Sequence, residues 1–382
     1  MSATTFRCHA GEFTLLRRPP APGQPLQAWD AADEYLLTAL DSGTPYAERV
    51  APEHRVLVVN DQFGALAIAL HGGSVHSWSD SITAQLATHD NLRRNELADT
   101  IHYVPATTLP DGRFDSVLWR LPKTQALLLQ QAALLRRCVD SDTRVFAAGM
   151  QKHLLPNCAD ILRTLGAVDI WPGQKKARVF QVTPDPQTQL AAAEQNRPLA
   201  VAEYDLQLQA GPNVFARDKL DIGARFFIEQ FAQLPRAQRI ADLGCGNGVL
   251  GILAARAQPA AAVHFFDESY QAVEAAAHNA AENVRDAVAG ALQFHVDDGL
   301  SHYSGEPFDL ILCNPPFHQG HSIGDHIAWQ LFRQSRRQLR AGGELWIVGN
   351  RHLQYHVKLK KLFGNCRQVA ANPKFVVLAA RV

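Results

Sequence analysis

The sequence predicts an α/β protein with two tandem Rossmann-like domains, each built on a mostly parallel sheet. Three observations predict this fold class. Short apolar runs rich in β-branched residues alternate with longer helical patterns, as in sheets that helices cover on both faces. The chain has 382 residues, which is enough for two domains. The pattern of the first half also returns in the second half.

The repeat consists of five matching segments in the same order. Residues 55–67 and 239–253 both read as strand, turn and helix. The other matching pairs are 75–81 with 263–269, 89–95 with 278–283, 114–123 with 308–317, and 152–155 with 351–354. We infer an internal duplication. It predicts a first domain at 1–185, a Pro- and Gln-rich linker at 186–200 and a second domain at 201–382.

Apolar periodicity places the remaining elements along the chain. Residues 1–25 are predicted as loop or sheet edge, and 29–40 as a helix with one apolar face. The elements predicted in the second half are a half-buried strand at 203–209 that could belong to a hairpin, helices at 222–231, 327–339 and 356–361, and strands at 345–348 and 375–379.

A glycine-rich turn joins a predicted strand to a helix predicted at 249–257. Gly244 and Gly246 let the backbone adopt positive φ and approach a ligand closely, beside the unpaired N–H groups of the helix start. The Gly-x-Gly-x-x-Gly spacing that begins at Gly246 also fits a dinucleotide. Asp242, however, would repel a pyrophosphate and attract an ammonium group. The turn therefore favours S-adenosylmethionine, which carries an ammonium group, over a nicotinamide cofactor.

Further acidic residues lie at two predicted strand ends. Asp267 follows Asp242 at roughly the ~20-residue distance expected of an acid that binds a ribose. It could instead cap the helix predicted at 269–281. Asp297 and Asp298 follow the strand predicted at 292–296, and one of them could bind the adenine amino group. Asp298 is the chosen candidate, with a solvated turn as the alternative.

The stretch 308–317 reads as a buried strand that enters a stiff polar loop. Asn314 places an amide at the carboxyl end of this strand, where open α/β sheets bind ligands. Pro315 fixes φ and leaves its carbonyl free to accept, and Phe317 offers a ring for stacking. Two acceptors, Asn314 Oδ1 and the Pro315 carbonyl, would bind both hydrogens of an NH2 group and leave its lone pair free for attack on an electrophile. An ordinary Asn-Pro turn is the alternative.

With these motifs, the chain resembles the S-adenosylmethionine-dependent methyltransferases that act on exocyclic amines. The stretches at 26–37, 213–217 with 220–227, 314–318, and 350–353 with 358–365 make it similar to the ribosomal RNA guanine-N2-methyltransferases, and to the large-subunit branch most of all. The resemblance implies an enzyme that methylates N2 of a guanine in 23S ribosomal RNA. The small-subunit branch, which acts on 16S ribosomal RNA, shares the catalytic half but is less similar in the tail.

Two other functions stay open from the residues. A glutamine-amide methyltransferase that acts on a protein also uses an Asn-Pro-Pro loop, usually with Tyr where this chain has Phe317. A non-catalytic RNA-binding assembly factor with two decayed domains is the second, although the intact glycine turn argues against it.

The first half has lost the residues of this chemistry. Its turn retains one glycine, Gly64, and its strand ends in Arg120, Leu121, Pro122 and Lys123 where the second half has Asn314 to Phe317. We therefore expect residues 1–185 to bind no S-adenosylmethionine and to serve in RNA docking or as a scaffold. The basic residues that could contact phosphates are Arg93, Arg94, Arg120, Lys123, Arg136, Arg137, Lys175, Lys176 and Arg178 in this half, and Arg333, Arg336, Arg337 and Arg340 in the second.

Composition limits the partners. Lys plus Arg and Asp plus Glu both number 37, so RNA binding must use local patches. The 6 cysteines form no CxxC pair, and no apolar stretch reaches the ~18 residues of a membrane span. Both observations predict a cytoplasmic protein without a membrane partner. The histidines at 318–326 do not match zinc spacing and fit a mobile substrate loop better, so no metal is expected.

Overall fold

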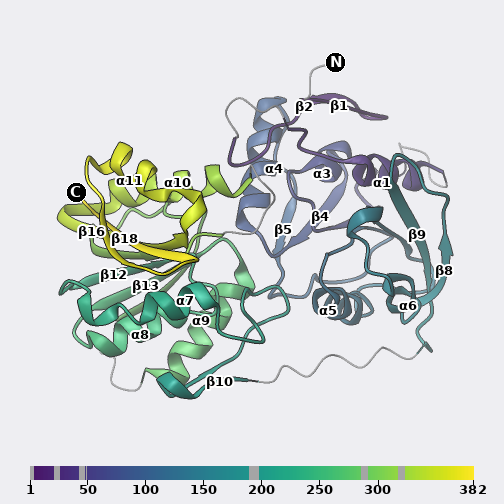
Figure 1. Cartoon of the computed structure of the whole chain (residues 1–382). Coiled ribbons are helices and arrows are strands. Elements are labelled where there is room, and N and C mark those ends of the chain that lie inside the picture. Colours follow the sequence, from purple (N-terminus) through teal and green to yellow (C-terminus); the bar gives the residue numbers. More distant parts are fainter. Residues whose placement is uncertain are drawn as a thin grey trace. The chain divides into compact units, whose positions relative to one another are not determined.

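The computed structural model describes residues 4–20, 26–42, 48, 50–188, 198–284, 291–316 and 323–382, except the side chains of 323–325. It separates into two compact units, Met1–Gln195 and Asn196–Val382, shown in Figure 1 from purple to teal and from teal to yellow. None of the described helices combines the length and the apolar character needed to cross a bilayer.

The N-terminal unit begins with a hairpin, β1 (Thr5–Cys8) and β2 (Gly11–Thr14), where the sequence predicted loop or edge. The elements that follow are α1 (Ala31–Asp41), β3 (Arg55–Val59), α3 (Ala65–Ala69), β4 (Ser74–Ser79), α4 (Ile82–Arg94), β5 (His102–Pro105), β6 (Ser116–Arg120), α5 (Gln125–Leu135), β7 (Arg144–Met150), α6 (Cys158–Leu162), β8 (Gly166–Ile170) and β9 (Ala177–Pro184). The described strands form a 7-stranded sheet in the order β5-β4-β3-β6-β7-β9-β8. Strand β9 is antiparallel to its neighbours and the other pairs are parallel.

The C-terminal unit repeats this layout. Its elements are β10 (Leu199–Val201), β11 (Leu206–Leu208), α7 (Ile222–Ile228), β12 (Arg239–Leu243), α8 (Val249–Ala257), β13 (Ala262–Asp267), α9 (Tyr270–Asn283), β14 (Leu292–Val296), β15 (Phe308–Cys313), α10 (Ile323–Gln338), β16 (Leu339–Asn350), α11 (Tyr355–Phe363), β17 (Arg367–Ala371) and β18 (Phe375–Arg381). The sheet order is β14-β13-β12-β15-β16-β18-β17, which matches the first unit strand for strand. The prediction of two Rossmann-like domains is confirmed.

The sheet of the C-terminal unit separates two apolar cores. Ile240, Leu310 and Leu312 point to the core that includes residues of α7, α8 and α9. Ala241 and Ile311, which alternate with them, point to the core that includes residues of α10 and α11. Figure 1 shows these two groups of helices on opposite faces of the sheet. Both faces are covered, which explains why Leu310, Ile311 and Leu312 of β15 are apolar without alternation.

Element boundaries agree best where apolar patterns are strong. Helix α8 and strand β14 have the predicted bounds. Helix α7 is shorter than predicted, and α10 begins at Ile323 rather than at 327. Strand β17 was not predicted, because its residues are largely exposed at the sheet edge and lack an apolar alternation.

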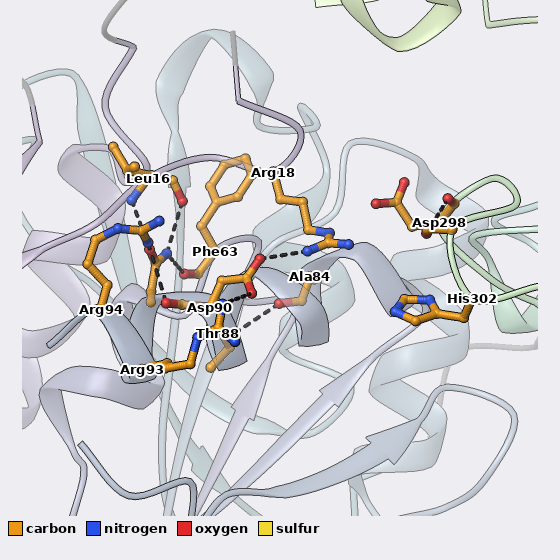
Figure 2. A network of polar contacts seen from close by, with 12 residues as sticks. Leu16, Arg18, Phe63, Ala84, Thr88, Asp90, Arg93, Arg94, Asp298 and His302 are labelled. Atoms are coloured by element: carbon orange, nitrogen blue, oxygen red, sulfur yellow. Dashed lines mark hydrogen bonds and ion pairs between the residues drawn. The ribbon is translucent and has the colours of Figure 1, made fainter. Parts of the chain in front are cut away.

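In each unit, a pair of asparagines fastens the segment at the end of the hairpin to a helix. In the N-terminal unit, the Asn91 side chain accepts from the Leu16 N–H at 2.9 Å and donates to the carbonyls of Leu16 and Phe63. Asn95 accepts from the Thr14 N–H at 2.8 Å. Figure 2 shows Leu16 and Phe63 beside the residues of α4.

The C-terminal unit repeats these contacts. Asn279 accepts from the Gln209 N–H at 2.7 Å and donates to the carbonyls of Gln209 and Asn247. Asn283 accepts from the Gln207 N–H at 3.1 Å. The same local interactions in both units support the internal duplication.

Candidate active site

The site residues predicted from the sequence gather at the carboxyl edge of the second sheet. Leu243 pairs with Cys313 across β12 and β15, so Gly244 and Asn314 follow from neighbouring strands. The Gly244 N–H donates to the Phe266 carbonyl at 2.8 Å, which joins the glycine turn to β13. Parallel strands end at one edge, where open α/β sheets bind ligands.

The four glycines of the turn have two different functions. Gly244 and Gly246 have φ of 74° and 54°, and a Cβ on either would meet no atom within 4 Å. These two leave open space above the strand ends, as a close ligand requires. A Cβ on Gly248 would lie 3.1 Å from Ala276, and one on Gly251 would lie 2.2 Å from the Phe265 ring. The last two glycines therefore permit helix packing.

Asp242 is the most confined carboxylate of the site. It is the penultimate residue of β12 and is fully buried. Its Oδ2 accepts from the Gly251 N–H at 2.8 Å, whereas its Oδ1 has no hydrogen-bond partner within the described part of the chain. Burial raises the pKa of Asp242 to about 7, and the nearby negative charge of Asp267 adds to this shift. A buried acceptor without a partner costs free energy unless a ligand supplies the donor.

Asp267 fixes the shape of the glycine turn. Its Oδ2 accepts from the Gly246 N–H at 2.9 Å and its Oδ1 accepts from the Ser269 N–H at 3.0 Å. The helix cap that the sequence left open for this residue belongs to Ser269, whose hydroxyl accepts from the Ala272 N–H. Asp267 remains at the end of β13 beside the loop, in the place predicted for a ribose-binding acid.

Asp298 lies beyond the end of β14 and is linked to helix α10. Its Oδ1 accepts from Gln330 Nε2 at 2.8 Å, and its carbonyl accepts from Gln334 Nε2 at 3.0 Å. The Asp297 N–H donates to the Asp267 carbonyl at 2.9 Å, which brings this turn next to β13. The contacts place Asp298 on the side of the edge that adjoins α10.

Only one of the two polar side-chain atoms of Asn314 has a hydrogen-bond partner among the described residues. Its Nδ2 donates to Asp221 Oδ2 at 3.3 Å, whereas its buried Oδ1 has no hydrogen-bond partner among the described residues. Asp221 also caps α7 by accepting from the Ala224 N–H at 2.8 Å. This link sets the orientation of the amide and presents the oxygen as an acceptor.

Two residues of this edge were not selected from the sequence. Asp221 precedes a predicted helix, so a cap was foreseeable, but its contact with Asn314 spans 93 positions and has no local signal. The Asn350 Oδ1 is a third buried acceptor without a partner in the described chain, at the carboxyl end of β16. Its place beside β15 follows only from the sheet order.

The structure describes only the first residues of the loop that follows Asn314. Pro315 is buried, and Phe317 lies outside the described residues, as do the histidines at 318–321. Among the described residues, no group of three or more His, Cys, Asp or Glu side chains is placed to hold a metal ion.

The same edge of the N-terminal unit is filled by its own side chains. Arg120, in the position of Asn314, donates to both carboxylate oxygens of Asp30 at 2.6 and 2.9 Å and lies 3.1 Å from Asp33. Asp61 accepts from three backbone N–H groups at the start of α3. Burial raises the pKa of Asp33 to about 7 despite the charge of Arg120. A cavity of about 40 Å³ remains here, which is too small for a nucleoside.

Known proteins match both units. The methyltransferase small domain family matches residues 205–379, and the RLMG N-terminal domain family matches residues 3–186. The ribosomal RNA large subunit methyltransferase G of Stutzerimonas stutzeri (strain A1501) is 46% identical over 376 residues, which cover 95% of this chain and 96% of the relative. The protein of the same name from Ectopseudomonas mendocina (strain ymp) is 45% identical over 378 residues and covers 98% of this chain and 99% of the relative.

One solved structure has the same fold over nearly the whole chain. It is RsmC, a 16S rRNA N2 methyltransferase of T. thermophilus, in complex with AdoMet and guanosine. The two chains align with a TM-score of 0.77 at 19% identity, and the alignment covers 99% of this chain and 97% of the other.

Proposed function

The chain belongs to the ribosomal RNA large subunit methyltransferase G family, and on that premise we propose that it methylates the N2 amine of a guanine in 23S ribosomal RNA. The enzyme depends on S-adenosylmethionine. The guanine must leave its base stack to reach the edge of the sheet. The cytoplasm, where ribosomal RNA is found, is the compartment of this activity.

The residues of the C-terminal unit fit the cofactor. Gly244 and Gly246 leave an open surface, and Asp242 Oδ1 is a buried acceptor suited to an ammonium group. Asp267 would bind the ribose hydroxyls and Asp298 the adenine amine. When bound, S-adenosylmethionine supplies a methyl group on a positively charged sulfur.

Asn314 and Pro315 position the amine for transfer. Asn314 Oδ1 and the Pro315 carbonyl accept the two amine hydrogens, so that the nitrogen lone pair points at the methyl carbon. The N–C bond forms as the C–S bond breaks, and the amine then loses one proton to solvent. Phe317 stacks on the base. Most of the rate gain comes from positioning and charge stabilisation.

The single observation that carries this proposal is the unpartnered, buried Asn314 Oδ1 beside an open glycine turn. A folded chain retains such an acceptor where a ligand completes it. The N-terminal unit lacks this combination among its described residues. We assign residues 1–185 to RNA docking or to a scaffold, 186–200 to a linker and 201–382 to catalysis.

Transfer of labelled methyl from S-adenosylmethionine to protein-free large-subunit and small-subunit ribosomal RNA tests the proposal. Label on a guanine of the large-subunit RNA alone is the expected result. Label on the small-subunit RNA alone would assign 16S methylation instead. Label only on a protein glutamine, tested in parallel, would assign the amide reaction. If the chain binds RNA but not the cofactor, it is a non-catalytic assembly factor.

A further inference from the structure

We propose that helices α10 and α11 of the C-terminal unit form a phosphate-binding face for the RNA substrate. In this face, Arg333 and Arg337 contact phosphates of the RNA backbone directly. The partner follows from the proposed function, so the inference rests on it. The face is separate from the residues assigned to the cofactor and to the amine. It would hold the RNA beyond the reacting guanine and give affinity rather than chemistry.

The two sides of α10 differ sharply. Ala328, Leu331, Phe332 and Ser335 are buried against the sheet, spaced three and four residues apart as in an amphipathic helix. The other side carries three exposed arginines, Arg333, Arg336 and Arg337. Arg333 and Arg337 are one turn apart and therefore project together. In Figure 1, α10 and α11 lie together on one face of the sheet.

Helix α11 adds a further positive charge, Lys361, next to the arginines of α10. Lys361 Nζ lies 5.6 Å from the centre of the Trp329 ring, which precedes Arg333 by one turn on α10. The three arginines make no hydrogen bond or ion pair with the described residues. The two helices together contain a single acidic residue, Asp325. The cations are thus available to a partner and are not neutralised by their surroundings.

The equivalent segments of the N-terminal unit show which part of this charge the fold repeats. Helix α5 follows β6 as α10 follows β15, and it has no charged residue at all. Arg136, which follows α5, donates to the backbone carbonyls of Thr164 and Pro186 and serves the fold. On α6, Asp160 pairs with Arg163 at 2.6 Å. By the register of the two sheets, Arg136 and Arg137 correspond to Arg336 and Arg337, whereas Ala133 takes the position of Arg333. Arg333 is therefore the cation that the C-terminal unit adds.

The position and type of these cations fit an RNA backbone. Helix α10 begins nine residues after Asn314 and runs away from the carboxyl edge, so Arg333 lies about 15 Å along the helix from Ile323. That length is comparable to a few nucleotides of backbone. Arginine binds the oxygens of a phosphate through two parallel N–H groups, so the guanidinium is suited to an RNA backbone. Because the whole chain has no net charge, the local face must supply the attraction.

The test compares the double variant Arg333→Gln/Arg337→Gln with the wild-type chain. Binding to protein-free large-subunit RNA is measured by filter retention at several salt concentrations. Each lost phosphate contact reduces the slope of log K against log salt by about 0.7–0.9, so a reduction of about 1.5 is expected. We expect KM for RNA to rise about tenfold, with kcat and the Kd of S-adenosylmethionine unchanged.

Two controls separate charge from structure. The variant Arg333→Lys/Arg337→Lys should keep most of the salt slope, and Arg236→Gln, an exposed cation outside these helices, should leave it unchanged. An unchanged slope in the double glutamine variant overturns the proposal and leaves an acidic protein as the occupant to test. If the wild-type chain shows the expected RNA binding without methyl transfer, the proposed function fails and the face stands.

Discussion

The two units have the same sheet and keep the same amino edge, but they differ at the carboxyl edge. Asp115 accepts from the Arg55 N–H at 2.8 Å, and Asp309 accepts from the Arg239 N–H at 2.9 Å. Each arginine also lies over a phenylalanine ring and next to a histidine, Phe114 with His76 and Phe308 with His264. Residues that the fold requires occur twice in the chain.

A comparison of the two carboxyl edges distinguishes the glycines that the fold requires from those that leave space for a ligand. Gly64 and Gly248 both have φ of 84° and both start a helix, so this glycine serves the fold. Gly244 and Gly246, which open the site, have no glycine counterpart in the N-terminal unit. Asp61 and Arg120 of that edge have partners within their own unit, whereas the edge of the C-terminal unit leaves Asp242 and Asn314 with unpartnered oxygens among the described residues. Among the described residues, the buried side-chain oxygens without a partner all lie in the C-terminal unit.

The largest effect on stability is expected at Arg120. The variant Arg120→Met would leave Asp30 and Asp33 without their cation and destabilise the N-terminal unit by about 3–5 kcal/mol. Chemical denaturation followed by circular dichroism measures this loss. Affinity for S-adenosylmethionine, titrated where the variant is still folded, should stay the same. A matching loss of affinity would show that the first edge contributes to cofactor binding.

The largest effect on turnover is expected at Asn314. The variant Asn314→Ala removes the acceptor for the amine, and kcat should fall by about 10²–10³. Binding of S-adenosylmethionine should survive, because the glycine turn is untouched. Near-normal turnover in single-turnover assays would refute the assignment of Asn314.

The pH dependence of stability tests Asp242. Its pKa is about 7 in the folded chain and about 3.9 in an unfolded one. The folded state therefore holds the proton more tightly, and the associated stability is complete below pH 4 and lost as the pH rises through 7. Asp242→Asn should be more stable than the wild type at pH 8, by about 1.4 kcal/mol for each pH unit that separates the two pKa values.

Urea unfolding of the cofactor-free proteins between pH 5 and pH 8 measures the difference. The advantage of Asp242→Asn should shrink toward pH 5, because the carboxyl of the folded state is then protonated and fewer pH units separate the solution from the unfolded pKa. A difference that does not change with pH would contradict the buried titration. The same variant should bind S-adenosylmethionine more weakly at pH 8, because the amide carries no negative charge.

A smaller effect is expected at Asp221, which positions Asn314 without touching substrate. The variant Asp221→Ser keeps a side chain able to cap α7 but is too short to hold Asn314 Nδ2. We expect kcat to fall about tenfold, the cost of one hydrogen bond of about 1.4 kcal/mol. The melting temperature should change little. If KM for the cofactor rises while kcat stays constant, the role is in binding instead.

The sequence predicted those features of the structure that depend on neighbouring residues or that occur in both units. The strand, glycine turn and helix at 239–257 and the internal duplication follow from periodicity and from matching segments. The link from Asp221 to Asn314 did not, because it depends on how a helix start packs against a distant strand end. The same limit applies to Asn350. The glycine pattern also could not tell which glycines open the site and which permit packing.

The most direct test of the contrast between the edges is the stoichiometry of S-adenosylmethionine binding to the full chain, measured by isothermal titration calorimetry. One molecule per chain is predicted, and Gly246→Val should abolish its binding, because a side chain would occupy the open surface and strain a φ of 54°. Two molecules per chain, or one that persists in Gly246→Val, would contradict the assignment of the cofactor site to the C-terminal unit alone.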